Sequence, residues 1–279
     1  MAANPIFKIG GDLEVNRLGF GAMRITGEGV WGWPPDRANA LKVLKRAVEL
    51  GVNLIDTADA YGPETSELLI AEALHPYPKG VVIATKGGLT RPGPGDWEPN
   101  GHPDYLKDCV NKSLKRLRLD RIDLYQLHRI DPKVPMEESL GAIKEMQSAG
   151  KIRHVGLSEV SVAEIERAKK VLPIVSVQNR YNIADRKWEK VIDYCEKENL
   201  GFLPWFPVGG GRGIKSGAAL DAVAKAHGVS VYQVALAWLL QRSPVMLPIP
   251  GTSNVQHLED NVSAAKLKLT PEEWKSLAG

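Results

Sequence analysis

The sequence predicts one α/β domain over residues 1–279, built as a single-domain (β/α)8 TIM barrel with an N-terminal β-hairpin and a helical C-terminal tail. Short apolar runs of strand type alternate with amphipathic stretches of helix type along nearly the whole chain. Eight such strand–helix units can be counted, and eight is the number that closes a parallel sheet into a barrel. No Ser/Gly-rich linker and no shift in composition divides the 279 residues into separate domains.

The composition is that of an ordinary globular protein, with 43% hydrophobic and 25% charged residues. The 36 basic and 33 acidic residues leave a net charge of +3, too small to favour a nucleic-acid or membrane partner. The longest apolar run, from Val234 to Leu240, is too short to span a bilayer. Cys109 and Cys195 lie in helical patterns without a shared short spacing, so two reduced thiols are expected. With no apolar signal region, we expect a cytoplasmic protein, a monomer or weak homo-oligomer, whose partner is a small molecule.

The elements are expected in the following order. Two alternating runs around Gly10-Gly11-Asp12 predict a hairpin from Phe7 to Val15. Strands are then expected to begin near Arg17, Val52, Val81, Ile122, His154, Val175, Phe202 and Val245. Amphipathic helices are expected over residues 36–50, 66–74, 103–117, 135–149, 162–171, 187–199 and 230–243. Ser230 with Gln233, and Thr270 with Glu273, form capping boxes that begin helices, and Gly51, Gly150 and Gly228 follow helix ends.

An open, doubly wound sheet is the competing architecture. It would normally carry a G-x-G-x-x-G motif after its first strand. Here the first strand gives Gly19-Phe20-Gly21-Ala22-Met23, which lacks the third glycine. The glycine-rich residues 209–213 follow the seventh strand instead, where barrels often bind phosphate. The barrel is therefore favoured.

Polar residues stand at the predicted ends of successive strands. Asp56 ends the second strand, Tyr61 follows on its loop, Lys86 ends the third strand and His128 ends the fourth. The later strands end in Ser158-Glu159, Gln178-Asn179 and Trp205. Because the carboxyl ends of barrel strands share one rim, these side chains are expected to face one site.

The chemistry that these residues suit is proton donation to a carbonyl oxygen. A free tyrosine has a pKa of roughly 10, and an adjacent lysine ammonium lowers it. Lys86 would act in this way on Tyr61, with Asp56 keeping the lysine charged. His128 would orient the substrate oxygen or assist donation.

A carbonyl that accepts this proton must also receive two electrons. No cluster with metal-ligand spacing and no flavin site stands out, so a nicotinamide cofactor is the economical electron donor. Trp205 offers a flat face to its ring, and Ser158 and Gln178 could hydrogen-bond its carboxamide.

The motifs Asp-Thr-Ala-x-x-Tyr-Gly and Leu-x-His resemble those of the aldo-keto reductase superfamily, and the likeness covers nearly the whole chain. Within it, residues 31–36, 178–184 and 206–210 look most like the pyridoxal reductase branch. The resemblance implies NADPH-dependent reduction of aldehydes or ketones to alcohols, with Asp56, Tyr61, Lys86 and His128 as the catalytic tetrad. It implies a substrate mouth lined by Phe20, Trp31 and Trp33. It also implies cofactor contacts from Gly21, Met23, Ser158, Gln178, Trp205, Val208, Gly209, Gly210, Gly211, Gly251, Thr252, Ser253, Asn254, His257, Asp260 and Asn261.

The sequence departs from the family pattern in three respects. Glu159 stands where asparagine is usual, which puts one carboxamide contact in doubt. Trp205 replaces the common tyrosine or phenylalanine as the ring that stacks on nicotinamide. Gly251 and His257 stand where lysine and arginine can occur, which leaves the preference for NADPH over NADH open.

Two other functions remain open from the sequence. A nucleotide-sensing module with incidental turnover would bind its cofactor tightly and release it slowly, although few residues precede Phe7 to contact a partner. A Schiff-base aldolase would use Lys86 as its nucleophile, although Asp56 would keep that lysine cationic. Three arginines near the rim, Arg91, Arg129 and Arg180, could touch a polar substituent of a substrate, with Arg91 better interpreted as a solvated loop cation. The Pro- and Gly-rich loop over residues 90–103 is expected to shape the pocket.

Overall fold

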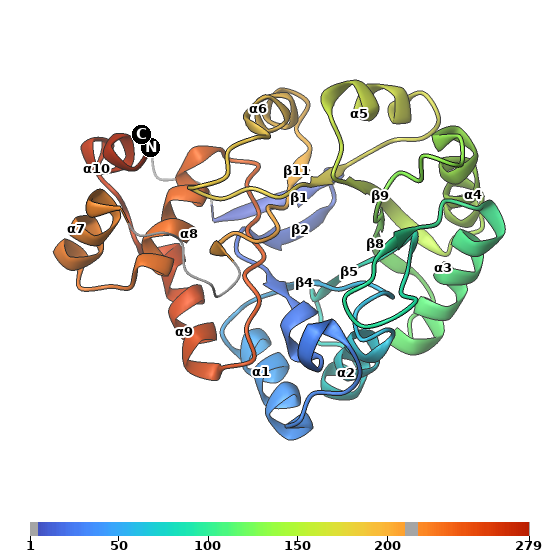
Figure 1. Cartoon of the computed structure of the whole chain (residues 1–279), viewed down its shortest axis with the longest axis horizontal. Helices are drawn as coiled ribbons and strands as arrows, with labels where there is room; N and C mark the ends of the chain where they lie inside the picture. Colours follow the sequence, from blue (N-terminus) through green and yellow to red (C-terminus); the bar gives the residue numbers. More distant parts are fainter. Residues whose placement is uncertain (1–4, 210–216, 279) are drawn as a thin grey trace.

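Seven parallel strands form one curved sheet in the order β11-β10-β9-β8-β5-β4-β3, in a computed structural model that describes residues 5–209 and 217–278. Helices surround this sheet (Figure 1). The strands are β3 (Phe20–Gly21), β4 (Leu54–Asp56), β5 (Val82–Gly87), β8 (Ile122–Leu127), β9 (Ile152–Ser158), β10 (Ser176–Gln178) and β11 (Gly201–Phe202). Their parallel order is the one expected for a barrel.

An extended segment over residues 246–250 closes the sheet into a barrel. The backbone N–H of Leu247 donates to the carbonyl of Phe202 at 2.8 Å, and the N–H of Gly19 donates to the carbonyl of Pro248 at 2.9 Å. The segment thus bonds to β11 on one side and to the chain entering β3 on the other. The expected eighth strand is therefore present as an extended, hydrogen-bonded segment without a regular ladder, because Pro248 and Pro250 have no N–H to donate.

The helices form the outer layer of the barrel. They are α1 (Arg37–Glu49), α2 (Thr65–Leu74), α3 (Pro103–Leu117), α4 (Met136–Ser148), α5 (Val162–Lys169), α6 (Glu189–Lys197), α7 (Ala218–His227), α8 (Val231–Arg242), α9 (Val255–Ser263) and α10 (Pro271–Ala278). Short 3-10 turns are η1 (Ala22–Ile25), η2 (Glu28–Val30) and η4 (Ala264–Lys266). The expected helices agree within about two residues at their ends. Both capping boxes form, since Ser230 and Gln233, and Thr270 and Glu273, bond reciprocally.

The N-terminal hairpin packs at the amino ends of the strands. It consists of β1 (Ile6–Ile9) and β2 (Leu13–Asn16), paired antiparallel as expected. A side-chain carbon placed on Gly201, the first residue of β11, would meet Phe7 and Ile9, so the hairpin lies against this end of the sheet. A second antiparallel pair, β6 (Leu89–Thr90) with β7 (Glu98–Pro99), was not expected and lies within the loop after β5.

The interior is apolar and well filled. One buried cluster joins the hairpin, most strands and α3 to α8, and a second lies between β3, β4, α1 and α2. Cys109 and Cys195 are both buried and form no disulfide bond, in agreement with the two reduced thiols that the sequence predicts. Among the described residues, none of the helices combines the length and apolar character needed to cross a membrane.

Candidate active site

A buried ion pair joins the ends of β4 and β5. The ammonium of Lys86 donates to Asp56 Oδ1 at 2.6 Å and to the carbonyl of Thr57 at 2.7 Å. The other carboxylate oxygen of Asp56 accepts from the side-chain amides of Gln178 at 2.8 Å and Gln126 at 3.2 Å. The side chains of Lys86 and Asp56 are 0% and 3% exposed. The fully buried ammonium of Lys86 is thus held by one carboxylate oxygen and one backbone carbonyl.

The environment of Lys86 keeps it charged. Burial by itself lowers the pKa of this lysine, but the charges and hydrogen bonds of Asp56 and Tyr61 outweigh burial, and the net pKa is raised. A Schiff-base nucleophile needs the neutral amine. The aldolase alternative therefore requires a protonation state that this site disfavours.

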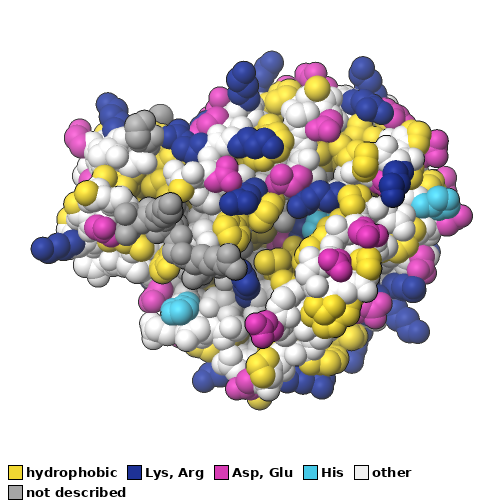
Figure 2. Space-filling view, viewed as in Figure 1, with side chains coloured by type: hydrophobic (Ala, Val, Ile, Leu, Met, Phe, Trp, Pro, Cys, Tyr) yellow, Lys and Arg dark blue, Asp and Glu magenta, His cyan; other side chains and the backbone are white. Residues whose placement is uncertain are grey.

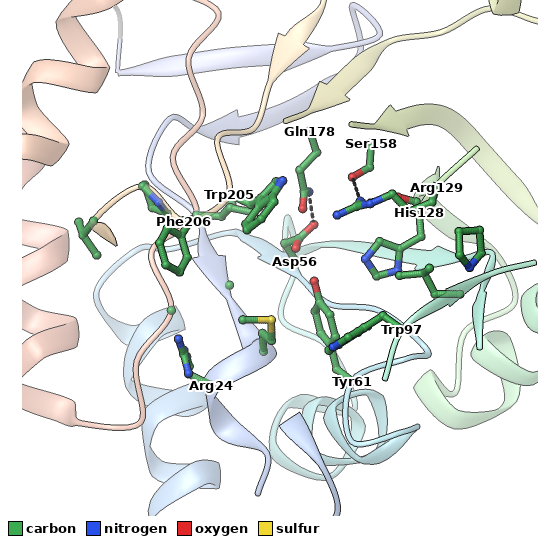
Figure 3. Close-up of a pocket in the computed structure, with 18 residues that line it drawn as sticks. Arg24, Asp56, Tyr61, Trp97, His128, Arg129, Ser158, Gln178, Trp205 and Phe206 are labelled. Atoms are coloured by element: carbon green, nitrogen blue, oxygen red, sulfur yellow. Dashed lines mark hydrogen bonds between the residues drawn. The ribbon is translucent and has the colours of Figure 1, made fainter. Parts of the chain in front are cut away.

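Tyr61 lies on the loop between β4 and α2, with its ring beside the ion pair. The ammonium of Lys86 lies 5.2 Å from the ring centroid, and the Tyr61 hydroxyl points toward the middle of the site (Figure 3). Burial raises the pKa of Tyr61, while the charge of Lys86 lowers it, and the net direction is upward. From the sequence, the neighbouring ammonium was expected to lower the pKa of Tyr61. That expectation was wrong for the net shift because the tyrosine is only 8% exposed and desolvation of its phenolate dominates.

His128 follows β8 and completes the cluster. Its backbone N–H donates to the carbonyl of Gly87 at 2.9 Å, which fixes the chain at the strand end. Its ring meets the ring of Tyr61 edge-on at a centroid distance of 5.8 Å. Burial and the positive charges of Lys86 and Arg129 hold the pKa of His128 well below its usual range. The imidazole is therefore neutral, with one N–H to donate and one nitrogen to accept.

The four residues border a cavity of about 460 Å³ at the carboxyl end of the strands. The face seen in Figure 2 is hollowed near its centre, with basic side chains around the hollow. The lining residues are Gly21, Met23, Arg24, Asp56, Tyr61, Leu89, Trp97, Pro99, His128, Arg129, Ser158, Gln178, Trp205, Phe206, Pro207, Val208, Ile249 and Gly251. Lys86 lies behind Asp56 and Tyr61, out of contact with the open space.

Trp205 forms one wall of this cavity, and Glu159 holds it. The indole N–H of Trp205 donates to Glu159 Oε1 at 2.7 Å, and the same oxygen accepts from the backbone N–H of Arg180 at 2.5 Å. Glu159, the hydrogen-bond partner of Trp205, has a positive φ of 56°, and Phe206, the next residue after Trp205, has a positive φ of 61°. Such a conformation is unfavourable for residues with bulky side chains. Glu159 thus holds the indole of Trp205 in place. It does so from the position where asparagine is usual in the family pattern.

Ser158 and Gln178 also face the cavity, and hydrogen bonds inside the protein engage part of each side chain. Ser158 Oγ accepts from Arg129 Nη1 at 2.9 Å, and the Gln178 amide donates to Asp56, as described above. The hydroxyl hydrogen of Ser158 and the carbonyl oxygen of Gln178 remain for a ligand. One donor and one acceptor are what a carboxamide group requires.

A second cavity of about 740 Å³ continues from the first, and both are bordered by Met23, Arg24, Val208 and Gly251. Its lining is Met23, Arg24, Thr26, Gly27, Glu28, Gly29, Val30, Val208, Ser230, Tyr232, Gly251, Thr252, Ser253, His257, Asp260 and Asn261. Most of the residues expected to bind the cofactor thus border one continuous groove. Gly209 and Asn254 do not line it, and Gly210 and Gly211 lie outside the described residues.

Beside the groove, the backbone of β3 lies close to the backbone of the segment before α9. A side-chain carbon on Gly251 would lie 2.5 Å from the carbonyl oxygen of Gly21, and one on Gly21 would lie 2.6 Å from the carbonyl oxygen of Ile249. Larger residues would push these backbones apart. Beyond this point the groove reaches the start of α9, where Asn254 caps the N–H of His257 at 3.1 Å. An extended, phosphate-bearing ligand fits such a path, because the amides at a helix start attract anions.

The substrate residues expected from the resemblance are placed elsewhere. Phe20 is fully buried in the apolar cluster between β3, β4, α1 and α2. Trp33 is 48% exposed and stacks on Arg37, with the guanidinium carbon 4.5 Å from its ring centroid. Trp31 stacks on Arg91 at 5.3 Å. None of these three residues is among the lining of either cavity.

Trp97 takes the place that those residues were expected to fill. Its ring centroid lies 6.2 Å from that of Tyr61 and 6.5 Å from that of His128. It belongs to the loop after β5, where Arg91 covers it with the guanidinium carbon 3.6 Å from the ring centroid. Arg91 also donates to the carbonyls of Val30 and Ala60 at 3.0 and 2.8 Å, so it is a clamp between loops instead of a solvated cation. The sequence signal was present in the Arg- and Trp-containing 90–103 loop, but its conformation was not predictable.

Comparison with known proteins agrees with this geometry. The model of the aldo/keto reductase family matches residues 17–279. An uncharacterized oxidoreductase of Schizosaccharomyces pombe is 55% identical over 267 residues, covering 96% of this chain and 87% of that protein. The pyridoxine 4-dehydrogenase of Escherichia coli is 44% identical over 275 residues, covering 96% of each. The solved structure of the glycerol dehydrogenase of Gluconobacter oxydans superposes with a TM-score of 0.88 at 28% identity, covering 99% of this chain and 94% of that one. The parallel barrel, the cluster at its rim and these likenesses together place the chain in the aldo/keto reductase family.

Proposed function

We propose that this protein is an NADP(H)-dependent reductase that converts aldehydes or ketones to alcohols, with Tyr61 as the proton donor. The observation that carries the proposal is the position of Tyr61 between a buried Lys86–Asp56 pair and a neutral His128, at one wall of an open cavity. Membership in the aldo/keto reductase family supports the same reaction class.

The groove supports a nicotinamide dinucleotide as the cofactor. When bound, it would supply the hydride that the carbonyl carbon receives. Trp205 would hold the ring against its flat face, and Ser158 and Gln178 would hold the carboxamide through their remaining donor and acceptor. The diphosphate and adenosine ends would follow the groove past Gly251 to the start of α9. There Arg24 brings positive charge and His257 brings a ring N–H donor, and Glu28 and Asp260 also line the groove.

The residues of the tetrad divide the proton chemistry among them. Burial keeps Tyr61 protonated and therefore loaded as an acid. As the phenolic proton moves to the carbonyl oxygen, the phenolate left behind is stabilised by the Lys86 ammonium. His128 is neutral, so it offers its N–H to the same oxygen without adding a competing acid. Asp56 keeps the ammonium charged throughout.

Pyridoxal is the substrate that we propose first. The relative from Escherichia coli is named for oxidising pyridoxine at its 4-position, and the reverse of that reaction reduces the 4-aldehyde. Trp97, Tyr61 and Trp205 give the cavity flat aromatic walls suited to a planar ring, and its volume of about 460 Å³ is in the ordinary range for small-ligand sites.

The test is a panel of aldehydes that includes pyridoxal, assayed by consumption of NADPH and of NADH. Tyr61→Phe should lower turnover by about a hundredfold or more, the usual contribution of a positioned acid, and should leave the Kd for NADPH nearly unchanged. Tyr77→Phe is the matched control, because the Tyr77 hydroxyl bonds the carbonyl of Leu117 at 2.8 Å, away from the cavity. Full activity in Tyr61→Phe would overturn the mechanism. Tight NADPH binding with turnover confined to one slow cycle would favour the nucleotide-sensing alternative.

A further inference from the structure

Arg129 brings positive charge into the cavity beside the tetrad. Among the described residues that line this cavity, the one carboxylate is Asp56, and Lys86 already neutralises it. Arg129 has no acidic partner within ion-pair distance in the described ranges 5–209 and 217–278. Glu159 acts on the charge of Arg129 from beyond ion-pair distance, but its Oε1 already accepts from Trp205 and from the backbone N–H of Arg180. The wall next to His128 therefore carries a positive charge to which no carboxylate of the described residues is directly paired.

The guanidinium of Arg129 is fixed by one of its nitrogens only. Nη1 donates to the carbonyl of His128 at 2.6 Å and to Ser158 Oγ at 2.9 Å. Within the described part of the chain, Nε and Nη2 make no hydrogen bond to the protein. The group points toward the middle of the site (Figure 3), and its carbon lies 6.0 Å from the Trp205 ring centroid. It is held in place and retains donors on the cavity side.

The other two arginines near the rim are differently engaged. Arg91 clamps the loops that carry Trp97, as described above. Arg180 donates from Nε to Asp185 at 2.9 Å, has a side chain that is 48% exposed, and does not line the cavity. Arg129 is thus the one of the three whose donors face the space where a substrate would lie.

We propose that Arg129 selects carbonyl substrates that carry an anionic oxygen, a phenolate or a carboxylate, beside the reacting carbonyl. This inference rests on the proposed function. A planar guanidinium whose donors are fixed and partly shielded from water binds such an oxygen strongly and with little loss of freedom. The hydroxyl oxygen on the pyridine ring of pyridoxal, which is attached next to the aldehyde and can ionise, meets this requirement.

The experiment compares pairs of aldehydes that differ in the anionic group alone. One pair is 3-hydroxypyridine-4-carbaldehyde with pyridine-4-carbaldehyde, and the other is 3-carboxybenzaldehyde with methyl 3-formylbenzoate. The measured quantity is the ratio of kcat/KM within each pair at fixed, saturating NADPH. The native protein should favour the anionic member in at least one pair, and Arg129→Met should lower that ratio by about 10- to 100-fold, the range for one charge-assisted hydrogen bond.

Two further variants separate recognition from other effects. Arg129→Gln retains a hydrogen-bond donor without the charge, and it should also lower the ratio; it serves if the methionine variant does not fold. Arg180→Met is the matched control, since its guanidinium lies at a similar distance from Trp205, 5.8 Å, outside the cavity. It should leave the ratio unchanged. The Kd for NADPH, measured by fluorescence, reports on the cofactor separately.

The outcomes are distinct. A native protein that reduces aldehydes without preferring the anionic member of either pair would overturn the inference and leave the proposed function standing. Loss of both members equally in Arg129→Met, or a raised Kd for NADPH with an unchanged ratio, would also overturn it, because Arg129 would then act on the tetrad or the cofactor. Absence of NADPH consumption with every aldehyde would instead contradict the proposed function itself.

Discussion

Replacing Lys86 with methionine should separate the structural part of the buried ion pair from its catalytic part. The change keeps a side chain of similar length but removes the ammonium that lies 2.6 Å from Asp56 Oδ1. A buried carboxylate would then be left without its counter-charge, and breaking a buried pair in this way typically costs 3–5 kcal/mol. Asp56 retains the amide donors of Gln126 and Gln178 on its other oxygen. We therefore expect the lower end, a loss of about 3 kcal/mol in the free energy of unfolding.

Urea unfolding measures this loss as a lower midpoint with an unchanged slope. The double variant Lys86→Met, Asp56→Asn removes the uncompensated charge, so it should regain much of the stability. It should remain inactive, because no ammonium is left to stabilise the Tyr61 phenolate. Lys112→Met is the control: Lys112 pairs with Asp108 at 2.7 Å, but both side chains are at least half exposed, so the midpoint should not move.

Either of two results would refute the reasoning. An unchanged midpoint in Lys86→Met would mean that the pair does not neutralise a buried charge. Recovery of turnover in the double variant would mean that the lysine acts only by holding Asp56 and not by assisting proton transfer.

Three further changes give direct predictions. Burial raises the pKa of Asp59 from 3.8 to about 7. The folded protein therefore keeps this proton to a higher pH than the unfolded chain, and it loses stability as the pH rises from about 4 to 7. Asp59→Asn should reduce this loss by up to about 4 kcal/mol, measured by urea unfolding at the two ends of the pH range. Arg91→Met should raise the aldehyde KM several-fold with little change in kcat, because the loop that carries Trp97 loses its bond to the carbonyl of Ala60; a steady-state assay decides, and unchanged KM would contradict the clamp. His257 lines the groove where the adenosine end would lie, and we predict that it contacts the 2′-phosphate, the group that NADPH has and NADH lacks. His257→Ala should then raise the KM for NADPH about tenfold and leave that for NADH unchanged; equal effects on both would refute this contact.

The positions of strand ends were predictable because they follow from local pattern. A buried strand stops where its apolar run stops, and parallel strands of a barrel share one rim. This suffices to bring Asp56, Lys86 and His128 together from residues far apart in sequence, and it places Tyr61 on an adjoining loop. The same argument placed Ser158, Gln178 and Trp205 at the cavity. For all of these residues except Tyr61, the only input is a position at or just after the end of a predicted strand.

The residues that shape the substrate side were not predictable in this way. Trp97 reaches the cavity through a Pro- and Gly-rich loop whose short β6–β7 ribbon and clamp by Arg91 depend on contacts with other loops. Trp31 and Trp33 were expected at the mouth on resemblance alone, and the bend of their segment turns them to Arg91 and Arg37. Loop conformation is set by tertiary contacts that no local pattern encodes.

The net pKa of Tyr61 exposes a second limit of sequence reasoning, and it also explains why the site needs all of its members. Strand order predicts that Tyr61 lies near Lys86, but it does not predict how deeply Tyr61 is buried. Burial decides whether the pKa of Tyr61 is raised or lowered. The same low-dielectric surroundings that keep the tyrosine protonated also neutralise His128, and they would neutralise Lys86 if Asp56 were absent. The ion pair is therefore what allows a positive charge to persist beside a buried phenol. A water-filled rim with the same residues would give a weaker acid–ammonium coupling and a partly charged histidine, so the chemistry depends on the closed wall as much as on the tetrad.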